Sequence, residues 1–374
     1  MDRRLLEQTI EVARATKAFD PKTLRKSLKL AVDSAPPEGA GKVEDTVNLL
    51  GHAARKVVEC VAAIIERPVE QACSEAGTPL LLASSIKRGL DVDWSDPAEI
   101  REALQTLLAQ LDALEKFIRR DLPEALKRAP LEETFDTLRQ LLDQDIDPDP
   151  SGGRRIRKGV APDRRVSVED SQMRHGRKSA NRRFNGYKRH LATNLIHACA
   201  VTPANRPEGE AAPAIQEDIA RQGRAIDALY VDRAYINIIL VPGRVVEFDP
   251  EACEPCPLRE KCTERAPDAG RTISIGVNER LQHKLRMLVM TRAGREKLRD
   301  RVGVEHRFAH LTRRQGRCTR YRGMRLNLFD TKRASSIEIL ETIQCKVTAS
   351  QANQCSSNTL TLTNALMAYI SLRF

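Results

Sequence analysis

Three acidic residues stand where they could bind metal ions. Asp33 in "KLAVDSAPP" and Asp232 in "LYVDRAYI" each follow an apolar run, and two prolines after Asp33 prevent a helix there. Both aspartates are therefore predicted to end extended segments. Glu305, in "REKLRDRVGVEHRFAHL", lies on a predicted helix one turn after Arg301. Carboxylates suit Mg²⁺ or Mn²⁺, and two such ions about 4 Å apart can hydrolyse a phosphodiester.

Each acid also has an ordinary structural explanation. An aspartate at the end of a strand is more often a turn residue that accepts hydrogen bonds from backbone amides. Arg301 and Glu305, at positions i and i+4, also have the spacing of a simple helix salt bridge, worth about 0.3–0.5 kcal/mol. The sequence alone leaves these alternatives open.

Apolar spacing predicts the helices of the first half of the chain. Leu6, Ile10 and Ala13 indicate an amphipathic helix over 2–16, and an Asp-Pro start predicts a second helix over 20–30. From 43 to about 144 the chain is expected to be helical and to serve as a scaffold.

The clearest of these helices begins near Trp94. Asp96 is expected to cap it, Pro97 suits its first position, and Glu99 completes a capping box. One apolar stripe follows, which is far more typical of core packing than of a ligand site: Leu104, Leu107, Leu108, Leu111, Leu114 and Ile118.

The second half changes period after a linker rich in Pro, Gly and charge. "NGYKRHLATNLIHACAVTPAN" predicts a strand pair with a turn near Thr193–Asn194, and a helix and the strand "DALYVDRAY" follow. A second helical region is expected over 278–310, and the last part of the chain is expected to be irregular and poorly ordered from about 345. Strand, strand, helix, strand indicates a layered α/β fold.

The charge of the chain is strongly asymmetric. Residues 1–150 carry 21 Lys/Arg against 28 Asp/Glu, whereas residues 151–374 carry 41 against 23. Such an excess of positive charge indicates a polyanionic partner, usually nucleic acid, although a solvated basic surface is the alternative. Two stretches, 154–190 and 307–325, concentrate the arginines that suit phosphate oxygens. The DNA-contact candidates are Arg174, Arg177, Lys178, Arg182, Arg183, Lys188, Arg189, Arg301, Arg313, Arg314, Arg317, Arg320 and Arg322.

The cysteines and the apolar runs indicate the cellular compartment of the protein. Nine cysteines, an odd number in a long chain, are typical of reduced cytosolic thiols. Cys253, Cys256 and Cys262 could bind Zn²⁺, but a structural zinc site needs four ligands and the distant His283 is the one further candidate; three free thiols are the alternative. No apolar run reaches the roughly 18 residues of a membrane span, and no signal-peptide core is evident. A cytoplasmic protein is expected.

Several blocks of sequence point to one family. They are "VDS" at 32–34, "GAGKVEDTVNLLG", "VEDSQMRHGRKSANRRFNGYKRHLAT", "AVTPANRPEGEAAP", "VDRAY", "VVEFDPEACEPCPLREKCT" and "RVGVEHRFAHLTRRQGRCTRYRGMRLNLFD". Together, from about residue 5 to 342, they resemble DDE transposases of the bacterial insertion-sequence branch that carries a Y-R-E-K signature around its glutamate.

The resemblance implies a fold and a reaction. The fold is an α/β RNase H-like core, a mixed sheet flanked by helices, here interrupted by a helical insertion. Asp33, Asp232 and Glu305 would bind two Mg²⁺ or Mn²⁺ ions, nick DNA at the element ends and let the freed 3′-hydroxyl attack target DNA. The expected partner is double-stranded DNA in the bacterial cytoplasm, associated with the nucleoid, and a homodimer is left open. The predicted divisions are 1–34 (helices and first catalytic strand), 35–150 (helical insertion), 151–342 (remaining core) and 343–374 (divergent, disordered tail).

The chain also departs from the family pattern. Only residues 1–32 precede Asp33, so the family's N-terminal helical domain is expected to be truncated. A strand after Tyr235 is expected to be deleted, Leu298 replaces the signature tyrosine and Thr312 the lysine. A cysteine common in the family would lie in the deleted segment. The leading interpretation is a transposase, and the alternative is a non-catalytic DNA-binding remnant. A weaker third reading is an RNA-binding or structural protein without a link to transposition.

Overall fold

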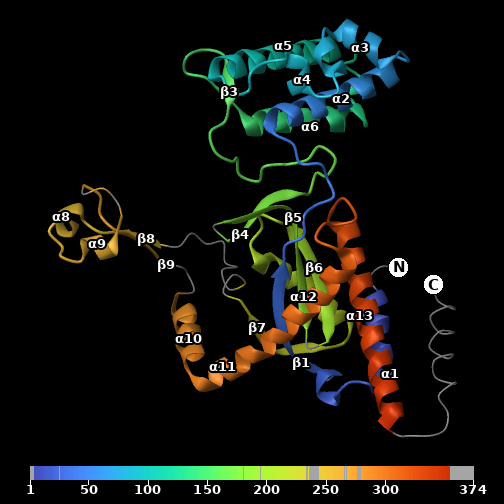
Figure 1. Cartoon of the computed structure of the whole chain (residues 1–374), viewed down its shortest axis with the longest axis vertical. Coiled ribbons are helices and arrows are strands. Elements are labelled where there is room, and N and C mark those ends of the chain that lie inside the picture. The colour runs from blue at the N-terminus through green and yellow to red at the C-terminus, as the bar shows by residue number, and fades with distance from the viewer. Residues whose placement is uncertain are drawn as a thin grey trace.

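A computed structural model describes most of the chain (Figure 1). The described residues are 4–24, 26–179, 181–193, 195–232, 235, 244–264, 266, 268–275 and 279–353.

A mixed sheet forms the centre of one half of the molecule. Its strand order is β4-β5-β1-β7, and β6 pairs with the other edge of β5. β1 is antiparallel to β5 and parallel to β7. This mixed sheet, flanked by helices, is compatible with an RNase H-like core. The strands are β1 (Ser27–Ala35), β4 (Arg174–Ser179), β5 (Arg182–Thr193), β6 (Ile196–Pro203) and β7 (Ala225–Val231).

Alternation along the strands gives the sheet two buried faces. Ala31 and Leu191 pack in a cluster with α1, α12 and α13, while Val32 and Ala192 pack on α7. Because Asp33 has the same parity as Ala31, it lies on the face that α12 covers. These helices are α1 (Leu5–Ala15), α7 (Ala212–Arg221), α12 (Val302–Gln315) and α13 (Met324–Asn353).

The predicted helical segment between β1 and β4 is confirmed, and Figure 1 shows it at the top of the view, apart from the sheet. It has its own apolar core, which includes the whole predicted leucine stripe. Asp96 caps α5 by accepting from the Ala98 N–H, but Glu99 accepts from Asp93 N–H rather than completing a capping box with Asp96. The helices are α2 (Thr46–Ile64), α3 (Val69–Ala76), α4 (Ile86–Leu90), α5 (Pro97–Asp121) and α6 (Leu131–Asp145).

Smaller elements complete the described chain. A hairpin of β2 (Ile146–Pro148) and β3 (Arg154–Ile156) lies in the predicted linker. A second small sheet joins β8 (Arg244–Glu247) to β9 (Thr272–Ile275). The remaining helices are α8 (Pro250–Cys253), α9 (Arg259–Cys262), α10 (Glu279–Met290), α11 (Arg292–Leu298) and the 3₁₀ turns Pro21–Leu24, Pro79–Leu82, Ala125–Lys127, Glu208–Ala211 and Arg299–Arg301.

Two secondary-structure predictions are wrong. The helix expected over 20–30 is a 3₁₀ turn followed by β1, in which Leu28, Leu30 and Val32 pack on one buried face of the sheet and Ala31 on the other. The irregular last part is instead the long helix α13 as far as Asn353. The remainder of the predicted tail, and residues 236–243 where a deleted strand was expected, lie outside the described residues.

Candidate active site

The strand register brings two of the predicted acids together. β1 and β7 are parallel neighbours whose last paired residues are Val32 and Val231. Asp33 and Asp232 follow these residues, so they lie side by side at the carboxyl ends of adjacent strands. Asp33 Oδ1 accepts a hydrogen bond from the Ser34 backbone N–H at 2.7 Å. Because both residues still belong to β1, this is not the bond of a turn-forming aspartate, which reaches the backbone two residues on. The second oxygen of Asp33 points to another partner.

That partner is Arg301, which lies across both carboxylates. Its Nη2 is 3.5 Å from Asp33 Oδ2 and 3.9 Å from Asp232 Oδ2. Arg301 ends the 3₁₀ turn that connects α11 to α12. Its Nε is buried and makes no hydrogen bond in the described part of the chain. A cationic side chain from a distant part of the sequence therefore bridges the aspartate pair.

Glu305 does not join this group in the described conformation. It lies in the first turn of α12, is exposed, and has no ion pair among the described residues. The alternative of a helix salt bridge between Arg301 and Glu305 is likewise absent there, since Arg301 pairs with the aspartates. Nowhere in the described ranges do three His, Cys, Asp or Glu side chains lie close enough to hold a metal ion. The structure thus assembles two predicted acids and Arg301, but not the third acid.

A buried polar network lies beside the aspartate pair. The Tyr235 hydroxyl is 2.7 Å from His190 Nδ1, and His190 Nε2 is 2.9 Å from Thr202 Oγ1. The Ser34 hydroxyl, which influences the pKa of Tyr235, donates to Glu208 at 2.9 Å. The network therefore joins β1, β5 and β6 to Tyr235, which follows β7.

Burial keeps the two central side chains of this network, those of His190 and Tyr235, uncharged. Complete burial lowers the pKa of His190 to about 3, with the nearby Lys188 charge adding to the effect. Burial also raises the pKa of Tyr235 above its ordinary value, and the carboxylates of Glu208, Asp33 and Asp232 add to this. A neutral imidazole and a neutral phenol thus hold the backbone beside the two carboxylates in one arrangement.

Sequence reasoning did not single out these network residues. One signal was present, because Ser34 directly follows Asp33 and Tyr235 is three residues after Asp232. The partner His190 pairs with Ser34 in the β1–β5 register, across more than 150 residues of sequence. That pairing becomes visible only when the sheet is known.

The first predicted basic stretch divides into two kinds of residue. Arg189 is buried, Arg174 bonds Asp163 at 3.0 Å, and Lys188 donates to the Arg206 carbonyl at 2.8 Å. The other members are exposed at the end of the β4–β5 hairpin: Arg177, Lys178, Arg182 and Arg183. This hairpin end extends beyond the carboxyl end of β1, because Ala35 pairs with Arg189 and β5 begins seven residues earlier, about 23 Å away.

The second basic stretch includes the loop 316–323, which is fixed beside the same hairpin. Glu38 bridges to Gly186 of β5 and to Cys318 of the loop. The Tyr187 hydroxyl is 2.6 Å from Asp170, and the Gly323 N–H donates to both residues. These bonds hold the exposed Arg317 and Arg320 near β5. Among the other predicted contacts, Arg313 is exposed, Arg314 pairs with Glu341 and Arg322 with Glu169.

The three predicted zinc ligands are free thiols on the small lobe around β8 and β9. Cys253, Cys256 and Cys262 are each partly exposed, and Arg271 donates to Cys262 Sγ at 2.7 Å. They do not form a group that could hold a metal within the described chain.

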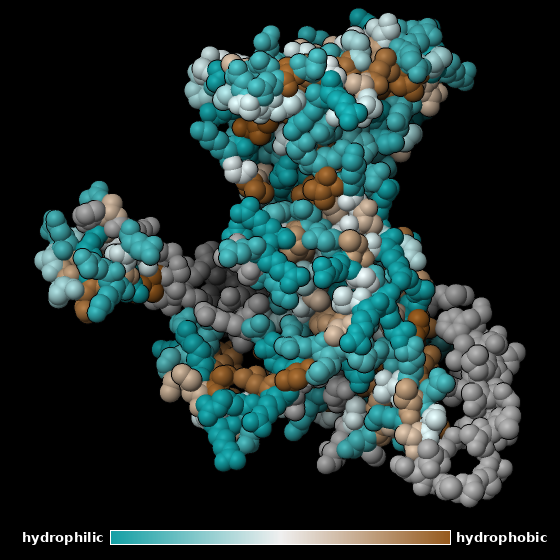
Figure 2. Space-filling model, in the orientation of Figure 1, coloured by the Kyte–Doolittle hydropathy of each residue, from teal (hydrophilic) through white to brown (hydrophobic). Residues whose placement is uncertain are grey.

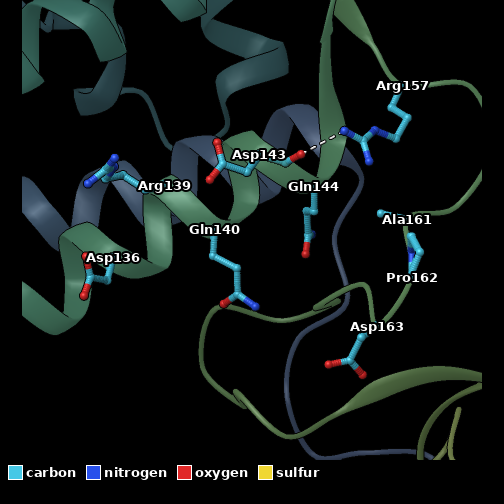
Figure 3. Close-up of a pocket in the computed structure, with 9 residues that line it drawn as sticks. All are labelled: Asp136, Arg139, Gln140, Asp143, Gln144, Arg157, Ala161, Pro162 and Asp163. Carbon is cyan, nitrogen blue, oxygen red and sulfur yellow. Dashed lines mark hydrogen bonds between the residues drawn. The ribbon is translucent and has the colours of Figure 1, made fainter.

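A cavity of about 620 Å³ lies elsewhere, between α6 and the linker that follows it (Figure 3). Its lining mixes carboxylates, amides and two arginines, and Arg157 bonds the Asp143 carbonyl at 3.0 Å. None of the predicted site residues lines it. In the part of the chain that the structure describes, no helix has the length and apolar character to cross a membrane.

Among known protein families, residues 241–332 match the transposase DDE domain. The match contains Arg301 and Glu305, whereas Asp33 and Asp232 lie before it. Comparisons with curated proteins and with solved structures give no match. The family match, in the segment that carries the third predicted acid, supports a DDE transposase.

Proposed function

We propose that the chain is a bacterial insertion-sequence transposase that cuts and joins DNA strands, with Asp33, Asp232 and Glu305 as ligands for two Mg²⁺ or Mn²⁺ ions. The observation that carries this proposal is the pairing of Asp33 and Asp232 at adjacent strand ends with a cationic group between them. The positively charged Arg301 lies against both aspartates, so the same pair of carboxylates is suited to bind a metal cation. Glu305 follows Arg301 by one helical turn and is proposed as the third ligand of the site.

The metal ions, when bound, would activate water or a 3′-hydroxyl and stabilise the leaving oxygen of the phosphodiester. The protein's own residues supply position. Asp33 and Asp232 are held by the β1–β7 register, and the bond between Tyr235 and His190 holds the chain just after Asp232. Asp232 is exposed.

Double-stranded DNA would lie over the basic hairpin and the loop 316–323. The exposed residues Arg177, Lys178, Arg182, Arg183, Arg317 and Arg320 reach beyond the carboxyl end of β1, the end that carries the aspartates. Arginine contacts to phosphate position DNA without reading its sequence. In this proposal the helices between β1 and β4 are an insertion into the catalytic core, and the protein acts on element ends and target DNA in the cytoplasm, beside the nucleoid.

The second candidate function is a DNA-binding remnant of a transposase. It is favoured by the separation of Glu305 from the aspartates and by Leu298 and Thr312, which replace the residues of the family signature. In this case the basic surface keeps its affinity for DNA while the carboxylates bind no metal productively.

Nicking of supercoiled plasmid in Mg²⁺ or Mn²⁺ separates these functions. The transposase proposal expects nicking that needs metal, is lost in Asp33→Asn and Glu305→Gln, and persists in the matched control Glu133→Gln on α6. Filter binding of the same plasmid is measured in parallel. DNA binding without nicking in the wild type supports the remnant, and absence of both contradicts both functions.

A further inference from the structure

The contacts of Arg301 are longer and fewer than those of a structural salt bridge. Strong Arg–carboxylate pairs are bidentate with contacts of about 2.7–2.9 Å, whereas one nitrogen of Arg301 is shared by two carboxylates at 3.5 and 3.9 Å. Its buried Nε has no hydrogen-bond partner in the described residues, which is unfavourable for a buried donor. One long hydrogen bond to Asp33 and charge attraction to both carboxylates therefore hold the guanidinium in place.

The aspartate pair, in contrast, needs a cation. Two carboxylates side by side at adjacent strand ends repel each other when both are ionised. In the described part of the chain, Arg301 pairs with both Asp33 and Asp232 and supplies a positive charge to the pair. The lysine of β5, Lys188, instead donates to the Arg206 carbonyl.

The position of Arg301 in the chain allows it to leave. It ends a three-residue 3₁₀ turn between α11 and α12, rather than standing in the middle of a long helix. The helices α10 and α11 that precede it contact each other and leave apolar side chains in solvent, as the brown residues at the lower left of Figure 2 show. The 3₁₀ turn Arg299–Arg301 contacts β1 and β7 but has no apolar side chain of its own to anchor it, whereas α12 is anchored by the buried Val304 and Phe308.

We propose that Arg301 is a built-in counter-ion of the Asp33–Asp232 pair, which it neutralises in the metal-free protein and which a divalent cation must displace. The inference rests on the proposed function, because it assumes that these aspartates bind metal. Its consequence is that the wild-type protein binds metal less tightly than the same carboxylates would without Arg301. Arg301 is a positioning residue in this proposal and acts through the aspartates.

Mn²⁺ binding followed by electron paramagnetic resonance tests this directly, without any activity assay. Removing the side-chain charge in Arg301→Gln should raise Mn²⁺ affinity about fivefold or more, the lower end of coupling between linked sites. Arg301→Lys keeps a positive charge and should gain less. Arg299→Gln removes an exposed charge from the same 3₁₀ turn and should bind as the wild type does.

The outcomes separate the two proposals. Adding Asp33→Asn to Arg301→Gln should abolish the gained affinity, which assigns it to this site. Equal or weaker Mn²⁺ binding by Arg301→Gln, while the wild type binds, overturns the counter-ion role and leaves the proposed function standing. Absence of Mn²⁺ binding in both proteins overturns both. Circular dichroism of each variant confirms that it is folded.

Discussion

Acid should destabilise the sheet through its buried histidines, and His190 gives the sharpest case. Its side chain is fully buried and its pKa is lowered to about 3 from the ordinary 6.5. In the unfolded chain it takes up a proton as the pH falls through 6.5, but in the folded protein it stays neutral until about pH 3. The stability that His190 contributes is therefore present above pH 6.5 and lost progressively below it.

The magnitude follows from the unfolded state alone. Between pH 8 and pH 5 a histidine with an unfolded pKa of 6.5 and a folded pKa well below 5 costs the folded state about 2 kcal/mol. The pKa of His190 in the folded protein hardly changes this loss of free energy, because the imidazole of the folded protein is neutral throughout this pH range. His197, whose pKa burial lowers to about 4, adds a similar loss.

Urea unfolding at pH 8 and pH 5, followed by far-UV circular dichroism, measures this loss. In His190→Gln the fall in unfolding free energy between the two pH values should be about 2 kcal/mol smaller than in the wild type. The single Trp94 packs on the core of the helical segment, so its fluorescence follows that segment separately. An identical pH dependence in both proteins would refute a neutral, buried His190. His197→Gln provides the same comparison at an independent position.

Three further predictions concern other parts of the molecule. Tyr187→Phe removes the hydroxyl that bonds Asp170 and Gly323 and should lower the free energy of unfolding by about 1–3 kcal/mol. Trypsin should then cut faster at Arg317, because the loop 316–323 is held less firmly. Unchanged cleavage would count against this bond. Leu107→Ala leaves a cavity in the core of the helical segment and should lower its free energy of unfolding, measured by Trp94 fluorescence, by about 2–5 kcal/mol. A loss below about 1 kcal/mol would contradict the full burial of Leu107. Arg183→Ala should lower the slope of log affinity for duplex DNA against log salt by about 0.9, and an unchanged slope would remove the hairpin end from the DNA surface.

Much of the fold followed from local pattern. The leucine stripe of α5 has a strong period of 3.6, and both this helix and the strand pair β5–β6 were predicted correctly. The segment that became β1 fits both periods, because Leu24 and Leu28 have helical spacing while Leu28, Leu30 and Val32 alternate. The burial of this segment between β5 and β7 decides the outcome, and that is not a local property.

The helix α13 was missed for a different reason. Its buried face carries many hydroxyls that read as polar loop residues, yet they bond the helix backbone one turn earlier: Thr331 donates to Asn327 carbonyl at 2.8 Å and Ser336 to Lys332 carbonyl at 3.0 Å. Lys332 in turn bonds the buried Asp218 of α7 at 2.7 Å. Such satisfaction of polar groups depends on tertiary partners that hydrophobic periodicity does not detect.

The candidate site was predictable in its acids but not in their arrangement. An apolar run that ends in an aspartate identified both Asp33 and Asp232, and their adjacency required the parallel β1–β7 pairing. The distance of Glu305 from them depends on how α12 lies on the sheet, and the role of Arg301 depends on the same contact. The sequence placed Arg301 beside Glu305, whereas the structure places it on the aspartates.

The central claim is that Asp33 and Asp232 together bind a divalent metal. Replacing Mg²⁺ by Fe²⁺ and adding ascorbate and peroxide generates hydroxyl radicals at the bound ion, which cut the nearby backbone. The account predicts cuts near residues 33 and 232, competed by Mg²⁺ and absent from Asp232→Ala. Cuts confined to other segments, such as the cysteines at 253–262, or a pattern unchanged in Asp232→Ala, would contradict it.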